Sequence, residues 1–380
     1  VEWVTLEENV LRQRVTTDIS AKGGQFDIMT IGMYETPIWA KNDWLVALDD
    51  MPAEYDVDDI LPAMRNGLSL DGTLYAAPFY GESSMIMYRQ DLMAKAGLDM
   101  PDAPTWEFVA KAARAMTDKE NDTYGICMRG KAGWGENMAF LTATGNAFGA
   151  RWFDEDWNAQ FDSEAWANTL NFYVDLVNEA GPPGASNNGF NENLSLFQQG
   201  KCGMWIDATV AASFVTNPTD STVADKVGFA LAPDTGLGKR GNWLWAWALA
   251  IPAGTQKEAA AKEFVQWATS KEYIELVAAK DGWANVPPGA RTSLYENPNY
   301  ASVPFAKMTL DSINAADPLN PTVDPVPYVG VQFVAIPEFA GIATQVGQEF
   351  SAALAGQQTT AEALAKAQAL TTDEMEAAGY

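Results

Sequence analysis

The sequence alternates short apolar runs with longer amphipathic segments, and this alternation limits the fold more than any other feature. Residues 25–32, 74–80 and 85–88 are apolar runs of strand length. Thr105 and Ser163 each precede an amphipathic segment, in the position that favours a helix N-cap. Short strands that alternate with longer helices predict an α/β fold with ligand sites in loops beyond strand ends.

Further elements continue this pattern. Residues 1–6 alternate like a strand, and residues 202–206 form another strand-like run. The remaining helices are predicted at 191–199 and after the candidate cap residues Thr255, Ser270 and Thr359.

The chain of 380 residues is longer than a single hydrophobic core usually supports, so two domains are expected. No apolar run approaches the roughly 20 residues that span a bilayer. No basic segment followed by an apolar stretch opens the sequence, so we expect any export signal to lie outside it.

Charge and composition exclude several classes of function. Fifty acidic residues against 24 basic ones give a net charge of −26, which makes nucleic acid and anionic membranes poor partners. The absence of histidine excludes His-based triad hydrolases and HExxH metalloproteases, and no metal or cofactor is expected. Cys127 and Cys202 form either one disulfide or two buried thiols.

Three tryptophans at two-residue spacing, Trp243, Trp245 and Trp247, would share one face of an extended strand. Their rings either stack on the apolar faces of a sugar or polyol, or fill a core between sheet and helix.

Carboxylates suggest one enzymatic alternative, a glycoside hydrolase, which needs two of them about 5–10 Å apart. The sequence supplies no evidence for such a pair among its candidates, which are Glu7, Glu8, Glu82, Glu136 and Asp207.

Two further motifs are weak. Residues 154–158 resemble the start of a calcium loop, but Ala159 and Ala165 replace the required Gly and Glu, so a solvated turn is expected. Residues 145–149 lack the spacing of a phosphate-binding loop.

Aromatic and hydrogen-bonding residues next to predicted turns form the remaining candidate site. Carboxylates and arginine suit vicinal hydroxyls because each engages two neighbouring groups at once. The candidates are Glu8, Tyr34, Tyr80, Glu82, Arg129, Trp134, Asp207, Trp243 and Trp245.

The order of five segments, at 26–30, 74–92, 197–204, 243–252 and 260–267, resembles family 1 extracellular solute-binding proteins of ABC importers, which include the maltose-binding protein. Residues 6–14 and 204–209 further resemble the sorbitol/mannitol-binding members.

The resemblance implies two α/β lobes of the type II periplasmic-binding-protein fold, with ligand enclosed between them by hinge closure. Lobe 1 would comprise residues 1–81 and 247–302, and lobe 2 residues 83–245 and 303–380. Family members normally have an additional strand and helix before the position where this sequence starts, so lobe 1 is expected to lack that strand.

The resemblance also implies ligand contacts. Glu8, Tyr34, Glu82, Asp207 and Trp243 with Trp245 match the family's usual contact positions, whereas Trp247 is expected in a core. The loop 129–137 and the pair Gln332 and Phe333 match contact regions of the second lobe.

These observations predict a monomeric, periplasmic protein that performs no chemistry. It would deliver a neutral polyol or a monosaccharide to the membrane permease of an ABC importer.

Overall fold

The computed structural model describes residues 1–380, which divide into two compact units. Unit 1 comprises residues 1–82 and 245–310, and unit 2 comprises residues 83–244 and 311–380. This division differs from the expected lobes mainly at 303–310, which belong to unit 1. The reason is packing: Ala306 is buried in one apolar cluster with Tyr300 and Ile274 of unit 1.

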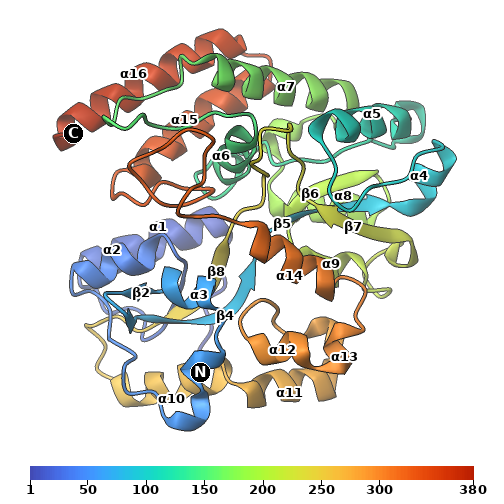
Figure 1. Ribbon diagram of the computed structural model, residues 1–380. Helices are drawn as coiled ribbons and strands as arrows, with labels where there is room; N and C mark the ends of the chain where they lie inside the picture. The colour runs from blue at the N-terminus through green and yellow to red at the C-terminus, as the bar shows by residue number, and fades with distance from the viewer. The chain divides into compact units, whose positions relative to one another are not determined.

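Unit 1 is built on a three-stranded antiparallel sheet with the strand order β1-β8-β4 (Figure 1). The strands of this sheet are β1 (Met29–Ile31), β8 (Trp245–Ala250) and β4 (Ala76–Glu82), and β2 (Ser69–Leu70) pairs with β3 (Thr73–Leu74) in a separate two-stranded sheet of unit 1. Its helices are α1 (Glu8–Ser20), α2 (Glu35–Lys41), α3 (Pro62–Gly67), α10 (Glu258–Ala268), α11 (Lys271–Asp281), α12 (Thr292–Glu296) and α13 (Pro298–Ala301), and α14 (Ala306–Ala315) continues across the boundary into unit 2.

Unit 2 has its own antiparallel sheet, of order β6-β5-β7. Its strands are β5 (Ser84–Arg89), β6 (Met204–Ala208) and β7 (Val227–Leu231). Its helices are α4 (Gln90–Lys95), α5 (Trp106–Met116), α6 (Asn137–Ala147), α7 (Glu164–Ala180), α8 (Phe190–Gln198), α9 (Ala211–Val215), α15 (Phe339–Leu354) and α16 (Thr360–Ala378). Single-turn 3₁₀ helices complete the two units at Ala53–Tyr55, Val57–Asp59, Lys119–Asn121, Ala185–Asn187, Ala224–Lys226 and Trp283–Asn285.

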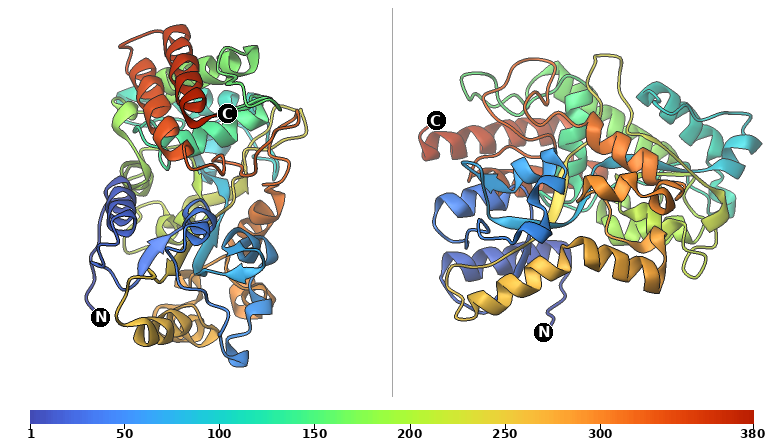
Figure 2. Two further views of the ribbon diagram at one scale, coloured as in Figure 1. Left: turned by 90° about the vertical axis from the view of Figure 1, so that its left-hand side faces the viewer. Right: turned by 60° about the horizontal axis from the view of Figure 1, so that its bottom comes forward.

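Helix α6 forms the centre of unit 2, because every one of its residues is buried. Helices α7, α15 and α16 pack beside it or on one another, and both views of Figure 2 show α15 and α16 side by side. Aromatic rings fill the space between these helices: the centroid of Trp166 lies 4.9 Å from that of Phe161 and 5.8 Å from that of Phe350. Close ring packing of this kind supplies much of a core's burial energy.

Most predicted caps are confirmed. The side chains of Thr105, Ser163, Ser270 and Thr359 accept hydrogen bonds from the first turns of α5, α7, α11 and α16. Thr255 is not a cap, since α10 begins three residues later at Glu258. Its hydroxyl donates instead to Asp27 at 2.8 Å.

One strand prediction is wrong. Residues 1–6 contain no strand, because no neighbouring strand pairs with them, and β1 is the edge of its sheet. The runs predicted at 74–80 and 85–88 are confirmed, since β4 runs from Ala76 to Glu82 and β5 starts at Ser84. The predicted turn at 154–158 is confirmed, with the Asp154 carboxylate accepting from the backbone of Asp156 and Asn158.

Cys127 and Cys202 form a disulfide, with a Cα–Cα distance of 5.9 Å and a sequence separation of 75. Both residues are fully buried. The backbone around Cys127 runs parallel to β6, and its N–H donates to the Met204 carbonyl at 2.8 Å. The disulfide therefore fixes the segment before Arg129 to β6.

Replacing both cysteines with alanine is expected to lower the free energy of unfolding by about 4 kcal/mol, because the open chain gains entropy when it unfolds. Urea denaturation of the variant and of oxidised wild type measures the difference, and reduced wild type is the matched control. Equal stability of oxidised and reduced wild type, with free thiols verified, would contradict this expectation.

Candidate functional site

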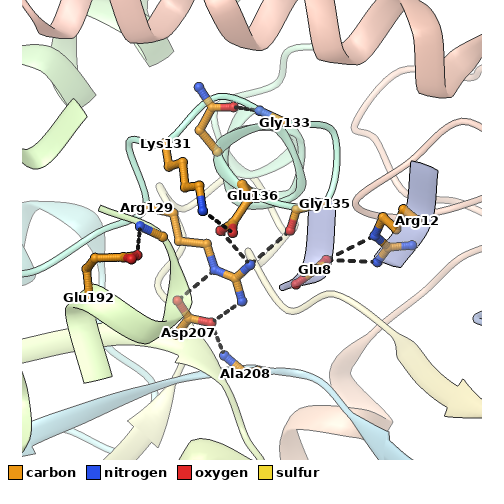
Figure 3. A network of polar contacts seen from close by, with 12 residues as sticks. Glu8, Arg12, Arg129, Lys131, Gly133, Gly135, Glu136, Glu192, Asp207 and Ala208 are labelled. Carbon is orange, nitrogen blue, oxygen red and sulfur yellow. Dashed lines mark hydrogen bonds and ion pairs between the residues drawn. The ribbon is translucent and has the colours of Figure 1, made fainter. Parts of the chain in front are cut away.

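The first cluster of polar and aromatic side chains belongs to unit 2 and is centred on Arg129, whose polar contacts Figure 3 shows. Its Nε donates to Asp207 Oδ2 at 2.9 Å and its Nη2 to Asp207 Oδ1 at 2.7 Å. Its Nη1 donates to the Gly135 carbonyl at 2.9 Å and to Glu136 Oε2 at 3.2 Å. The guanidinium is therefore held as a two-pronged fork on one carboxylate and touches a second, which is the strong geometry for arginine.

The Asp207 carboxylate makes two further hydrogen bonds. Trp205 Nε1 donates to Oδ2 at 3.1 Å and the Ala208 N–H donates to Oδ1 at 2.7 Å. Asp207 is fully buried on β6. Each oxygen already accepts two hydrogen bonds, so the main effect of Asp207 is to hold Arg129.

The backbone of Arg129 is also fixed. Its carbonyl accepts a hydrogen bond from the Tyr173 hydroxyl at 2.8 Å. Burial raises the pKa of Tyr173 above its usual value, which keeps this hydroxyl protonated as a donor.

Glu136 completes the polar part of this cluster. Lys131 Nζ lies 3.9 Å from Glu136 Oε1, and the carboxylate packs against the backbone of Gly189, where a Cβ would lie 2.6–2.8 Å from its atoms. The two cations, Arg129 and Lys131, match the two carboxylates in number. The cluster is formally neutral, which suits an uncharged ligand.

Aromatic rings lie beside this charged group. The Arg129 guanidinium lies 5.4 Å from the ring centroid of Phe190 and 5.9 Å from that of Trp243. The backbone N–H of Trp243 donates to Ser84 Oγ at 3.2 Å. We call Arg129, Lys131, Glu136, Asp207, Phe190 and Trp243 the unit 2 cluster.

Gln332 holds the chain next to Trp243. Its Oε1 accepts from the Leu244 N–H at 3.2 Å and its Nε2 donates to the Leu244 carbonyl at 2.7 Å. Gln332 therefore positions the segment before β8 with both ends of its amide.

The other two candidates of unit 2 are buried aromatic residues. Phe333 is buried, and so is Trp134, whose ring meets the Phe339 ring edge-on at a centroid distance of 6.0 Å.

The second cluster belongs to unit 1 and is centred on Arg12 of α1. Its Nε and Nη2 donate to Glu8 Oε1 at 3.1 and 2.9 Å, and its Nη1 donates to Glu35 Oε1 at 2.7 Å. Glu35 Oε2 accepts from the Gly32 N–H at 3.0 Å. Figure 3 shows the Glu8–Arg12 pair.

The rings of Trp245 and Trp247 lie against Arg12, whose guanidinium is 5.1 and 4.6 Å from their centroids. The two rings lie 5.7 Å apart on one face of β8, at an interplanar angle of 80°. We call Glu8, Arg12, Glu35, Trp245 and Trp247 the unit 1 cluster. It combines indole faces with carboxylates, as recognition of a hydroxylated ligand requires.

Trp247 differs from its expected role in a core. It is only partly buried, whereas Trp245 is 4% exposed. Trp247 also lines a cavity of about 470 Å³ within unit 1, together with Glu8, Tyr80 and other, mostly hydrophobic, residues. Gly32 lies next to the Trp245 ring, so close that a Cβ at this position would be 1.8 Å from Cζ2.

The other two candidates of unit 1 lie at the ends of elements. Tyr34 is the N-cap residue of α2 and is buried. Glu82 is buried at the end of β4, opposite Trp245 of β8.

Several residues of the two clusters were missed as ligand-site candidates: Arg12, Glu35 and Phe190. One signal was available for Arg12, which lies four residues after Glu8 and so shares a helix face with it. Glu35 is 23 residues from Arg12 in sequence, and no local pattern connects them.

Gly32→Ala is expected to weaken ligand binding at least about tenfold, because the added Cβ would lie 1.8 Å from Cζ2 of Trp245 and displace the ring. Calorimetry and tryptophan fluorescence measure the change. Gly254→Ala is the matched control, since nothing lies within 4 Å of its added Cβ. Equal affinity of the two variants would contradict the placement of Trp245.

The structure contains no group of His, Cys, Asp or Glu side chains suited to hold a metal ion. None of its helices has the length and apolar character to cross a bilayer.

Comparison with known proteins finds the same family over most of the chain. The model of bacterial extracellular solute-binding proteins matches residues 1–275. The mannitol-binding protein of Pseudomonas aeruginosa is 55% identical over 380 residues, which are 100% of this chain and 87% of that protein.

Two solved structures are similar along the whole chain. An ABC transporter solute-binding protein from Agrobacterium vitis with bound D-mannitol is 69% identical, has a TM-score of 0.99, and is matched over 100% of this chain and 92% of its own. One from Agrobacterium radiobacter in complex with ribitol is 25% identical, with a TM-score of 0.85 and coverage of 97% and 90%. The predicted fold and the resemblance to polyol-binding members are confirmed, and this chain belongs to the bacterial extracellular solute-binding protein family.

Proposed function

We propose that this protein binds an acyclic polyol, with mannitol as the first candidate, and delivers it to the membrane permease of an ABC importer. The observation that carries the proposal is the pair of clusters, in which indole or phenyl rings lie beside guanidinium and carboxylate groups. The high identity to two proteins described as binding mannitol supports the same ligand.

The chemistry of the clusters fits a neutral, hydroxyl-rich ligand. Carboxylates accept hydrogen bonds from hydroxyl groups and guanidinium groups donate them, while aromatic faces contact the CH groups of the carbon chain. A ligand whose hydroxyls do not match would leave buried polar groups unsatisfied, which costs about 1–3 kcal/mol for each group. This cost is the basis on which we expect stereoisomers to be discriminated.

The proposal includes closure of the two units around the ligand, with contacts from Glu8, Tyr34, Tyr80, Glu82 and Trp245 of unit 1. Unit 2 would contribute Arg129, Trp134 and Trp243, while Asp207, Gln332 and Phe333 would position them. A ligand that contacts both units stabilises a closed arrangement by its differential affinity for it. We propose that the protein acts as a monomer in the periplasm.

The alternative of a glycoside hydrolase has no supporting observation. A hydrolase needs a carboxylic acid that donates a proton to the leaving group. Both oxygens of Asp207 accept hydrogen bonds from two donors each, so this carboxylate is fully engaged by the protein itself. The family is one of solute-binding proteins.

Calorimetry with mannitol, sorbitol, ribitol, glucose and glutamate tests the proposal. We expect at least one polyol to bind, with mannitol the tightest, and glutamate to give no signal. Small-angle scattering is expected to show a smaller radius of gyration with mannitol than without it. Silence with every polyol and sugar, combined with binding of an amino acid, would refute the function.

A further inference from the structure

Arg12 is a buried cation that no expectation from the sequence assigned to the site. Its side chain is 10% exposed, and it lies on the face of α1 that also buries Val15 and Ile19. Burying a guanidinium is costly unless its donors are paired. Arg12 is paired with Glu8 and Glu35 at the same time.

The two carboxylates have different roles around Arg12. Glu35, the first residue of α2, is anchored because its second carboxylate oxygen accepts a hydrogen bond from the Gly32 N–H, three residues earlier. Glu8 lies in the first turn of α1 and receives two N–H groups of Arg12 on a single oxygen. Arg12 therefore fixes Glu8 relative to Glu35, which lies on a different element.

The same guanidinium also constrains two indoles. It lies within about 5 Å of the ring centroids of Trp245 and Trp247, a distance at which a cation is attracted to a ring face. Trp245 additionally contacts the backbone of Gly32. One side chain thus connects a carboxylate and two aromatic rings of the unit 1 cluster.

We propose that Arg12 is a positioning residue that sets the orientation of Glu8, Trp245 and Trp247 for ligand binding. The proposal rests on the function proposed above, in which Glu8 and Trp245 contact the polyol. The planar fork of arginine is essential, because it meets two carboxylates and two rings together. A lysine ammonium is a compact point charge and does not reproduce this geometry.

Three variants test the proposal: Arg12→Met, Arg12→Lys and Arg14→Met. Arg14 lies on the same helix, is exposed, and has its guanidinium 5.4 Å from the Phe26 ring, so Arg14→Met is the matched control. We expect Arg12→Met to raise the Kd for mannitol about 30-fold or more and Arg12→Lys about tenfold. Arg14→Met is expected to leave the Kd within about twofold of wild type.

Near-ultraviolet circular dichroism of the unliganded, folded proteins reports the orientation of the tryptophan rings, which a loss of stability alone does not change. Both Arg12 variants are expected to change the tryptophan bands, whereas Arg14→Met keeps them. A double-mutant cycle compares the effect of Arg12→Met in wild type and in Trp245→Ala. We expect the factor by which Arg12→Met raises the Kd to be about tenfold or more smaller in Trp245→Ala, because the indole that Arg12 orients is absent.

Unchanged tryptophan bands and Kd in Arg12→Lys would overturn the proposal, and so would additive effects in the cycle. If Arg12→Met does not fold, Arg12→Lys decides the matter, since it keeps the charge and the length of the side chain. If wild type binds no polyol, the proposed function fails, and the bands of the unliganded variants still decide whether Arg12 orients the indoles.

Discussion

Asp207→Ala is expected to lower the free energy of unfolding of unit 2 by about 3–5 kcal/mol, because it leaves the buried Arg129 guanidinium without its two-pronged partner. The Trp205 indole N–H and the Ala208 N–H lose their acceptor as well. Mannitol binding is expected to weaken about 30-fold or more, because Arg129 is no longer held.

Urea denaturation and calorimetry measure the two effects separately. Asp91→Ala is the matched control, since Asp91 forms the same two-pronged pair with Arg89 in the same unit but is 40% exposed. Because the Asp91 carboxylate is solvent-accessible and Arg89 also donates to the Gly200 carbonyl, removing Asp91 is expected to cost about 1 kcal/mol or less, with no change in the Kd.

The double variant Arg129→Met with Asp207→Leu separates stability from binding. Replacing a buried ion pair with apolar side chains of similar size is often neutral for stability. We expect the double variant to recover much of the stability that Asp207→Ala loses, while mannitol binding stays weak. Binding of wild-type strength in either variant would show that Arg129 and Asp207 serve the fold alone.

Much of the fold was predictable because its signals are local. Ser163 and Thr359 lie directly before the helices that they cap, so a single hydroxyl and its nearest N–H groups determine the feature. Residues 1–6 show the limit of this reasoning. They alternate like a strand, but a strand forms only where a neighbour supplies hydrogen bonds, and sequence alone does not reveal that neighbour.

The site was predictable in part. The spacing of Trp243, Trp245 and Trp247 predicted a shared face, but only the last two lie on β8. Trp243 lies before the strand and contacts Arg129 of unit 2. Two-residue spacing specifies a shared face only while the chain stays in one strand, and the boundary between the units falls at 244/245.

Trp245→Ala is expected to weaken mannitol binding by about 2 kcal/mol, or about 30-fold, as truncation of a central aromatic contact usually does. It is also expected to lower the free energy of unfolding by about 3–5 kcal/mol, because the indole is 4% exposed and its removal leaves a cavity. Calorimetry gives the first quantity and urea denaturation the second.

A loss of stability alone does not identify a ligand contact, so the control must be equally buried. Trp39→Ala provides it: Trp39 is also 4% exposed and belongs to unit 1, where its ring lies 6.3 Å from Trp44. Both variants are expected to lose similar stability, and only Trp245→Ala is expected to lose affinity. If the two variants bind mannitol equally well, Trp245 is a core residue and the ligand lies elsewhere.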